Sequence, residues 1–314
     1  MNREGNVRRI ETLPSGARLS CAFGCFDGVH IGHRALLDAA VKRAESDGSF
    51  AAVWTFSEPV SRPWLFSVEE RLSLCGAAGI RYALCESFGE VRGLSPREFV
   101  ERLCKRVEIS HAVCGYNFRF GKDRAGDSES LREELTRCSG TAARAGAENA
   151  VTVIGAVVAL GDTVSSTRIR QLLLDGRTED AAVLLGRAYS MKGTVLSGKQ
   201  IGRTVALPTV NLRFSENQIV PKRGVYYTVC KIGGVSHRAV TNIGFRPTVN
   251  GDENDVNCES HIIDFNSTVY GETAEVCFYR YARSEHRFPD VSALAAQIRT
   301  DIDGANAYFD SVGV

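Results

Sequence analysis

Two histidines stand three residues apart in a glycine-containing segment, residues 24–33, which reads GCFDGVHIGH. Glycines allow a tight turn and a close approach to a ligand, and the amides that open a following helix attract anions. A neutral imidazole donates a hydrogen bond near pH 7, so His30 and His33 are suited to stabilise a five-coordinate phosphorus. The alternative, two ordinary loop histidines, is less attractive because two of the chain's six histidines fall in this one turn.

A second polar segment, residues 163–170, reads TVSSTRIR and opens a helical pattern of leucines. Taken alone, one hydroxyl at a helix start most often serves only as a cap. The hydroxyls of Ser165, Ser166 and Thr167, followed by the guanidinium of Arg168, also form a cradle for a polyphosphate, because a guanidinium fork matches phosphate oxygens. Together the two segments indicate a site that handles a nucleotide.

A framework for these segments is predicted in the first half of the chain, where apolar runs alternate with amphipathic segments. Such alternation predicts an α/β fold with a parallel sheet covered on both faces and ligands at the carboxyl ends of its strands. Residues 95–98 read SPRE, a capping box with proline at the first helical position. The predicted strands are 18–23, 51–56, 81–85, 111–115 and 150–160, and the predicted helices are 33–46, 68–78, 95–107 and 127–138.

The second half of the chain is β-rich, with short strand patterns separated by glycine turns. Gly233 and Gly234 separate two of these patterns and form a hairpin signal. This organisation predicts a small antiparallel β-barrel with a closing helix, and a division into domains 1–183 and 184–314. The predicted strands are 193–196, 225–232, 236–243, 259–265 and 274–281, and the predicted helices are 178–185, which can belong to either domain, and 291–309.

The second half also carries groups that suit phosphate chemistry. Residues 193–203 hold glycines and Lys199 in a loop able to fold over phosphates. Thr209 and Asn211 lie two residues apart, so in an extended segment they share a face and can hold one Mg²⁺, which prefers oxygen ligands. Glu259 begins a strand pattern; without further support it reads most simply as a strand carboxylate that faces solvent.

Composition sets the general class of this protein. The chain has 314 residues, 44% of them hydrophobic, and a formal net charge of +1, as expected of a globular protein of about two domains with no basic surface for nucleic acid. Its apolar runs are too short to cross a membrane, and we expect a cytoplasmic location. The ten cysteines occur singly and are predicted to be mostly buried thiols, with Cys25 in the loop as the exception. A homo-oligomer is compatible with the sequence.

Several of these segments resemble known motifs. Residues 30–33 and 165–170 resemble the His-x-Gly-His and Ser-Ser-Thr-x-Ile-Arg motifs of the nucleotidyltransferase superfamily. Residues 115–122, GYNFRFGK, resemble the middle motif of the FAD synthetase module in bacterial bifunctional riboflavin kinase/FAD synthetases. The flap at 193–203 and the segments at 207–212, 242–248 and 259–265, which read LPTVNL, NIGFRPT and ESHIIDF, resemble the riboflavin kinase module of the same family.

The resemblance implies two ATP- and Mg²⁺-dependent reactions: phosphorylation of riboflavin to FMN in a C-terminal barrel, and adenylylation of FMN to FAD in an N-terminal Rossmann-like nucleotidyltransferase domain. In this interpretation Glu259 is the base that deprotonates the ribityl hydroxyl, and His30 and His33 lie at the α-phosphate. The implied adenylyltransferase binding residues are Gly24, Phe26, Asp27, Gly28, Asn117, Ser165, Ser166, Thr167 and Arg168, and the kinase binding residues are Gly193, Gly198, Lys199, Gly202, Arg203, Pro208, Thr209 and Asn211, with Thr209 and Asn211 as Mg²⁺ ligands.

The chain departs from the family pattern at a few positions. Ala206 and Leu207 stand where the family usually has glycine and phenylalanine, and residues 57–60, SEPV, replace the usual Glu-Pro-His-Pro. Two alternatives therefore stay open. One is an FMN adenylyltransferase whose barrel binds flavin without kinase activity. The other is a non-catalytic flavin sensor, against which the presence of His30, His33 and Glu259 argues.

Overall fold

The computed structural model describes residues 7–58, 60, 63–139, 151–196, 209–214, 217–245, 256–265, 267 and 269–314. The chain forms two compact units, Met1–Ser166 and Thr167–Val314. The division falls after the first residue of α7 (Ser166–Leu174), whereas the domain boundary predicted from the sequence, at residue 183, lies within α8 (Thr178–Leu185).

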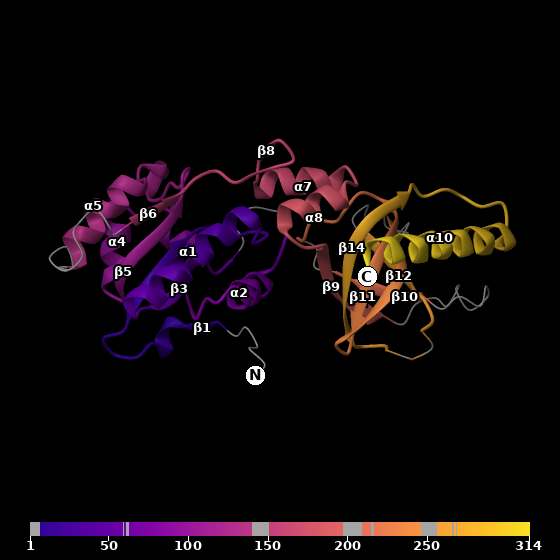
Figure 1. Cartoon of the computed structure of the whole chain (residues 1–314), viewed down its shortest axis with the longest axis horizontal. Helices are drawn as coiled ribbons and strands as arrows, with labels where there is room; N and C mark the ends of the chain where they lie inside the picture. Colours follow the sequence, from indigo (N-terminus) through magenta and orange to yellow (C-terminus); the bar gives the residue numbers. More distant parts are fainter. Residues whose placement is uncertain are drawn as a thin grey trace. The chain divides into compact units, whose positions relative to one another are not determined.

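The first unit contains a parallel sheet of six strands in the order β1-β4-β3-β2-β5-β6 (Figure 1). All neighbouring strands pair in parallel, which confirms the predicted doubly covered sheet. A separate two-stranded sheet is formed by β7 and β8. The strands are β1 (Arg8–Arg9), β2 (Arg18–Phe23), β3 (Phe50–Phe56), β4 (Tyr82–Glu86), β5 (Glu108–Gly115), β6 (Val151–Ile154), β7 (Val158–Ala159) and β8 (Asp162–Thr163).

Helices cover both faces of this sheet, and each face has its own apolar core. Leu37 of α1 and Cys75 of α2 belong to one core, while Phe99 of α4 and Leu131 of α5 belong to the other. The capping box predicted at residues 95–98 is confirmed at the start of α4, and a second one opens α2. The helices are α1 (Ile31–Asp47), α2 (Val68–Ala77), α3 (Phe88–Val91), α4 (Pro96–Cys104) and α5 (Ser128–Ser139), with single 3₁₀ turns at Ile10–Thr12 and Lys122–Arg124.

The strand order places a topological switch point between β2 and β5. From β2 the chain adds β3 and then β4 on one side, whereas β5 and β6 lie on the other. In open α/β sheets ligands bind outside the carboxyl ends of the strands at such a point. The segments that leave β2 and β5, residues 24–30 and 116–121, therefore lie at the expected ligand crevice.

The second unit is a closed antiparallel barrel in the order β10-β13-β12-β11-β14-β9, which confirms the predicted architecture. The last helix of the chain packs against β11 and β12 and confirms the predicted closing helix. The strands are β9 (Tyr189–Leu196), β10 (Thr209–Arg213), β11 (Gly224–Ile232), β12 (Val235–Phe245), β13 (Val256–Ile262) and β14 (Thr273–Arg283), and the helices are α7 (Ser166–Leu174), α8 (Thr178–Leu185) and α10 (Val291–Val312).

A buried ion pair fastens α10 to the barrel. The carboxylate of Asp301 accepts two hydrogen bonds from the guanidinium of Arg283, at 3.0 and 2.7 Å, and a third from Gln297 at 3.0 Å. Asp301 is only 5% exposed. At the same interface Gly304 lies so close to the Tyr227 hydroxyl that a Cβ atom would approach it to 2.3 Å. A larger residue at position 304 would therefore require the Tyr227 side chain to move.

Some sequence predictions need correction. Residues 150–160 do not form one strand, because the chain turns between β6 and β7. The two-residue strand β1 and the strand β10 were not predicted; β10 is held by pairing with β9 and β13, and such long-range pairing leaves no local signal. The prediction for the cysteines is confirmed. All ten lie among the described residues and none of them forms a disulfide. Six are buried, and only Cys25 is exposed.

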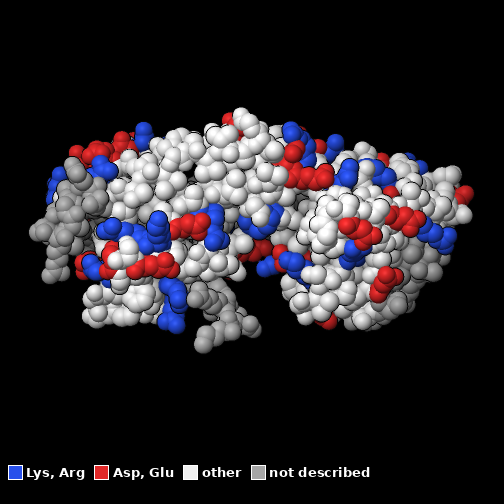
Figure 2. Space-filling model, viewed as in Figure 1, with Lys and Arg blue, Asp and Glu red and all other residues white. Residues whose placement is uncertain are grey.

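On the surface of the chain, positive and negative side chains are mixed. Figure 2 shows Lys and Arg interspersed with Asp and Glu on the visible face, without an extended area of one sign. Among the described helices, none combines the length and the apolarity that are needed to cross a bilayer.

Candidate functional site

The loop between β2 and α1 has an unusual backbone. Phe26, Gly28 and Val29 have φ values of 51°, 88° and 39°, in the left-handed region. Glycine adopts this conformation easily, but a buried phenylalanine and a β-branched valine do so only when the surroundings impose it. The turn therefore depends on Phe26 and Val29 as well as on Gly28. Gly24 instead leaves space for the Phe26 ring, which a Cβ atom would approach to 3.3 Å.

Hydrogen bonds hold this loop from several sides. The Asp27 carboxylate accepts the backbone amides of Leu65, at 3.0 Å, and of Phe66, at 3.3 Å. The Asp27 carbonyl accepts the hydroxyl of Ser166, at 2.7 Å. Predicted as a phosphate-binding residue, Asp27 thus ties the loop to the segment before α2, while Ser166, at the start of α7, fixes the loop backbone.

The sequence analysis did not single out Arg71, which also contacts this loop. Arg71 lies in the first turn of α2 and is 3% exposed. Its guanidinium donates to the Cys25 carbonyl, which also accepts the Thr55 hydroxyl at 3.2 Å, and to the Phe56 carbonyl at 3.4 Å. In the sequence Arg71 reads as one charge among several in a helical pattern, and only the fold shows that it is buried beneath the loop.

The two predicted histidines lie face to face at the end of the loop. Their rings stack with centroids 3.6 Å apart and an interplanar angle of 13°. Nδ1 of His30 accepts the backbone amide of His33, at 3.2 Å, and so caps α1. Because this nitrogen acts as an acceptor, the neutral His30 ring carries its proton on Nε2. Gly32 permits the stacking, because a Cβ atom there would come within 3.2 Å of the His30 ring.

His33 is held in its neutral form. Burial lowers its pKa well below 6.5, and the positive charges that His30 and Arg71 carry when protonated lower it further. Its Nδ1 atom is buried and has no hydrogen-bond partner among the described residues. A neutral imidazole with an unpaired buried nitrogen next to a helix N-terminus is suited to a hydrogen bond with a phosphoryl ligand.

The other predicted residues of the first site occupy the expected elements. Asn117 follows β5 and is exposed, in a turn closed by the 2.9 Å hydrogen bond from the Phe118 amide to the Gly115 carbonyl. Ser165 and Ser166 are half-buried where α7 begins, and Thr167 and Arg168 follow in its first turn. The loop and Asn117 thus flank the switch point of the sheet, as predicted for a ligand crevice.

Aromatic rings cluster at the carboxyl ends of β3 and β5, a feature that the sequence analysis missed. The Trp54 ring contacts those of Phe56 and Phe99, with centroids 4.9 and 5.0 Å apart. Phe118 and Phe120 stack with centroids 5.5 Å apart. Phe56 and Phe118 are half-buried, so part of each ring is accessible. The aromatic residues at positions 54, 56, 118 and 120, spaced two apart, were a usable signal.

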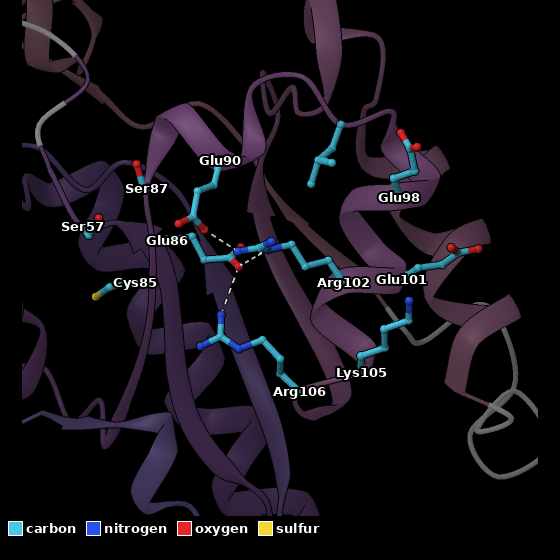
Figure 3. Close-up of a pocket in the computed structure, with 11 residues that line it drawn as sticks. Ser57, Cys85, Glu86, Ser87, Glu90, Glu98, Glu101, Arg102, Lys105 and Arg106 are labelled. Atoms are coloured by element: carbon cyan, nitrogen blue, oxygen red, sulfur yellow. Dashed lines mark hydrogen bonds and ion pairs between the residues drawn. The ribbon is translucent and has the colours of Figure 1, made fainter.

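A hollow of about 790 Å³ lies beside α3 and α4 in the same unit (Figure 3). The buried carboxylate of Glu86 lies in it and accepts hydrogen bonds from Trp54, Arg102 and Arg106 at 2.8 to 3.0 Å. Figure 3 shows Arg102 and Arg106 directed toward this carboxylate. None of the predicted site residues lines the hollow. Its paired charges fix α4 and the segment between α4 and β5 to the end of β4 rather than present an unpaired group to a ligand.

The predicted kinase residues meet on one face of the barrel. Asn211 of β10 lies directly opposite Glu259 of β13, which in turn lies opposite Asn242 of β12. Directly opposite residues project to the same face of a sheet. The next residues along, Ser260 and Thr241, share a 2.8 Å hydrogen bond in the closed interior, so the row of Asn211, Glu259 and Asn242 faces outward.

This row is partly shielded from solvent. Asn211 is 5% exposed, and Glu259 and Asn242 are half-buried. Glu259 is thus not the fully exposed strand carboxylate of the simpler interpretation. The Asn242 side chain donates to Glu285 at 2.9 Å, which adds a second carboxylate at the edge of the row.

Thr209 and Asn211 fit the predicted Mg²⁺ ligands in their chemistry. Both offer a side-chain oxygen on the same face of β10, and Glu259 lies opposite Asn211. Within the described part of the chain, no group of three His, Cys, Asp or Glu side chains could hold a metal ion by itself. Any Mg²⁺ at this position must therefore take further oxygens from phosphates or water, as this ion commonly does.

Part of the predicted kinase site cannot be placed. Gly193 lies within β9, where a Cβ atom would come within 2.6 Å of the Arg213 carbonyl, so the predicted loop does not begin there. Seven residues of interest lie outside the described residues: the predicted binding residues Gly198, Lys199, Gly202, Arg203 and Pro208, and the departures Ala206 and Leu207.

In comparisons with known proteins, each half of the chain matches its own family model, and the chain as a whole matches bifunctional enzymes. A family model described as FAD synthetase matches residues 14–168, and one described as riboflavin kinase matches residues 185–309. The bifunctional riboflavin kinase/FMN adenylyltransferase of Listeria monocytogenes is 32% identical over 298 residues, which cover 92% of this chain and 91% of that protein. The enzyme of the same name from Pseudomonas fluorescens is 34% identical over 313 residues, 96% of each chain.

The fold as a whole has a solved counterpart. The crystal structure of a macrolide-efflux protein from Streptococcus pneumoniae superimposes with a TM-score of 0.81 and 27% identity, over 96% of this chain and 97% of that one. This likeness extends over both units of the chain.

Proposed function

Because this chain belongs to the family of bifunctional riboflavin kinase/FMN adenylyltransferases, we propose that it phosphorylates riboflavin to FMN and adenylylates FMN to FAD, with release of pyrophosphate. The observation that carries the proposal is that each half of the chain contains its own arrangement of reactive groups. The histidine pair lies at the switch point of the sheet, and Glu259 lies opposite Asn211 on the barrel.

For adenylyl transfer, the chain's part is to hold ATP and to stabilise charge. The loop amides and the imidazoles of His30 and His33 donate hydrogen bonds to the α-phosphate as the FMN phosphate attacks it in line. Ser165, Thr167 and Arg168 bind the outer phosphates, which leave as pyrophosphate. Neutral His33 is compatible with this role, because a neutral imidazole keeps one ring N–H that can donate a hydrogen bond.

The aromatic cluster supplies a surface for the flavin. An isoalloxazine ring is flat and largely apolar, and it gains from stacking on aromatic side chains. Phe56 and Phe118 are the cluster members whose rings are partly accessible, and both follow or end strands beside the switch point. We place the FMN ring against them, with Asn117 next to its phosphate.

For the kinase reaction, Glu259 accepts the proton of the terminal ribityl hydroxyl as that oxygen attacks the γ-phosphate of ATP. The partial burial of Glu259 limits competing water, and Asn211 opposite it orients the reactants. Thr209 and Asn211 would hold Mg²⁺, which neutralises negative charge on the phosphate oxygens when it is bound. The flap beyond β9 would cover those phosphates.

Other parts of the proposal concern the organisation of the protein. We assign residues 1–183 to the adenylyltransferase domain and 184–314 to the kinase domain, with riboflavin, FMN and ATP as the substrates. Ten cysteines without a disulfide fit a reducing compartment such as the cytoplasm. The alternatives of an adenylyltransferase with an inactive barrel and of a flavin sensor receive less support, since the riboflavin kinase model matches nearly the whole barrel.

Two substitutions test the assignment of separate sites. His30→Ala should lower FAD formation from FMN by about 100-fold or more, because it removes a donor to the transferring phosphate, and leave FMN formation from riboflavin nearly unchanged. Glu259→Gln should do the reverse. One reaction is started with riboflavin and another with FMN, and the FMN and FAD formed in each are separated by chromatography and quantified. Equal loss of both activities in either variant would show that the sites are not separate.

A further inference from the structure

Arg71 carries a buried positive charge that is not paired with a carboxylate of the described residues. Its side chain is 3% exposed, and it takes part in none of the ion pairs, with a limit of 4.0 Å, that the described residues form. Its Nε atom is buried and has no hydrogen-bond partner within the described part of the chain. Burying a charge without a counter-charge is unfavourable, and such groups commonly mark functional sites.

The position of this charge relates it to the nucleotide loop. The guanidinium reaches from α2 to the Cys25 carbonyl and to the carboxyl end of β3, where it contacts the Thr55 hydroxyl and the Phe56 carbonyl. The same segment before α2 holds Asp27 through the Leu65 amide. Residues 65–71 thus hold the loop by hydrogen bonds at Cys25 and at Asp27, the two neighbours of the strained Phe26.

The loop carries one negative charge of its own, on Asp27. The Asp27 carboxylate is turned toward backbone amides, and the two imidazoles stack on each other. The charge of Arg71 reaches this pair, since it contributes to the lowered pKa of His33, after burial and His30. A triphosphate bound at the loop would supply a negative counter-charge for the Arg71 guanidinium.

We propose that Arg71 is a positioning residue of the adenylyl-transfer site, which fixes the loop through the Cys25 carbonyl and supplies a buried positive charge for the bound nucleoside triphosphate. The inference rests on the proposed adenylyltransferase function. It assigns two separable effects to one side chain. The two nitrogens of the guanidinium fork join the loop, at the Cys25 carbonyl, to the end of β3, at the Phe56 carbonyl, and the charge favours ATP binding.

The two effects are separated by three substitutions. Arg71→Lys keeps the charge but loses the fork, so kcat for FAD formation should fall about 10-fold while KM for ATP changes little. Arg71→Gln keeps a donor but loses the charge, so KM for ATP should rise about 10-fold or more. Arg71→Met loses both, and kcat/KM should fall by about 100-fold. FMN formation from riboflavin should stay at the wild-type rate in all three variants.

Arg97→Gln is the matched control, because Arg97 lies on α4 of the same unit but is exposed and forms an ion pair with Glu101 on its own helix. Tryptophan fluorescence, which reports on the first unit through Trp54 and Trp64, shows whether each variant is folded. If the glutamine and methionine variants unfold, the lysine variant alone decides between a fall in kcat at constant KM, which supports the proposal, and wild-type kinetics, which overturns it.

Other outcomes would overturn the inference. Folded lysine and glutamine variants with the same kinetic parameters would show that charge and geometry are not separate contributions. Parallel losses of both enzyme activities would indicate a role in stability only. If the wild-type chain itself forms no FAD from FMN, the proposed function fails, whereas an active wild type with unaffected Arg71 variants contradicts only the role of Arg71.

Discussion

Replacing Asp27 tests whether this carboxylate fixes the loop or binds phosphate. In Asp27→Ala the amides of Leu65 and Phe66 lose their acceptor, and both residues are buried, at 0% and 2% exposure. A hydrogen bond to a charged group contributes about 1.5 to 3 kcal/mol, and because Asp27 is half-buried we take the lower end. Two such bonds give a loss of about 3 kcal/mol in the free energy of unfolding of the first unit.

Asp27→Asn is the matched control. The amide oxygen can still accept both backbone amides, because Oδ1 makes the 3.0 Å and the 3.3 Å contact in the wild type. The loss should therefore be about 1 kcal/mol, which reflects the missing charge. The asparagine variant should also keep most of its FAD-forming activity, since the loop remains anchored.

Urea unfolding followed by tryptophan fluorescence measures these differences. Both tryptophans of the chain, Trp54 and Trp64, belong to the first unit, and Trp64 immediately precedes Leu65. The reasoning would be refuted if Asp27→Ala unfolded within about 0.5 kcal/mol of the wild type, the usual range of a surface substitution. Loss of FAD formation in a fully stable Asp27→Asn variant would instead assign the carboxylate to ligand binding.

Two further predictions concern titration and packing. The pKa of His33 is lowered in the folded chain, so below pH 6.5 the unfolded chain binds a proton that the folded one does not, and stability falls as the pH drops. Relative to His33→Gln, the wild type should lose up to about 1.4 kcal/mol per pH unit between pH 6.5 and 5 in urea unfolding; a pH-independent difference would contradict this. Asp301→Ala strands the Arg283 guanidinium and should destabilise the second unit by about 3 kcal/mol, measured by circular dichroism; a loss below about 1 kcal/mol would mean that water replaces the pair.

Local signals in the sequence account for much of the fold. The serine and glutamate of the segment 95–98 identify the start of α4 because both halves of a capping box are local. Strand β10 lacks such a signal, since its register depends on partners more than ten residues away in the sequence, β9 and β13. For the same reason the break between β6 and β7 could not be predicted from a continuous apolar run.

The residues of the candidate site likewise fall into those that the sequence identified and those that only the structure reveals. His30, His33 and Asn211 were identified from residue type and spacing, and Glu259 from the resemblance to the riboflavin kinase module. The structure brings these four residues together in pairs. The burial of Arg71 and the left-handed conformation of Val29 arise from tertiary contacts with the loop, so neither can be seen in the sequence. Sequence motifs name the groups that face a ligand, whereas the groups that hold them in place are found only in the fold.

The central claim, two successive reactions on one chain, is tested most directly by incubating the purified protein with riboflavin, ATP and Mg²⁺ and separating the flavins by chromatography over time. A parallel reaction starts from FMN. The account predicts that FMN appears first from riboflavin and that FAD follows in both reactions. FAD from FMN with riboflavin left unchanged would contradict the kinase assignment and direct attention to Ala206 and Leu207, and the absence of both products would contradict the account as a whole.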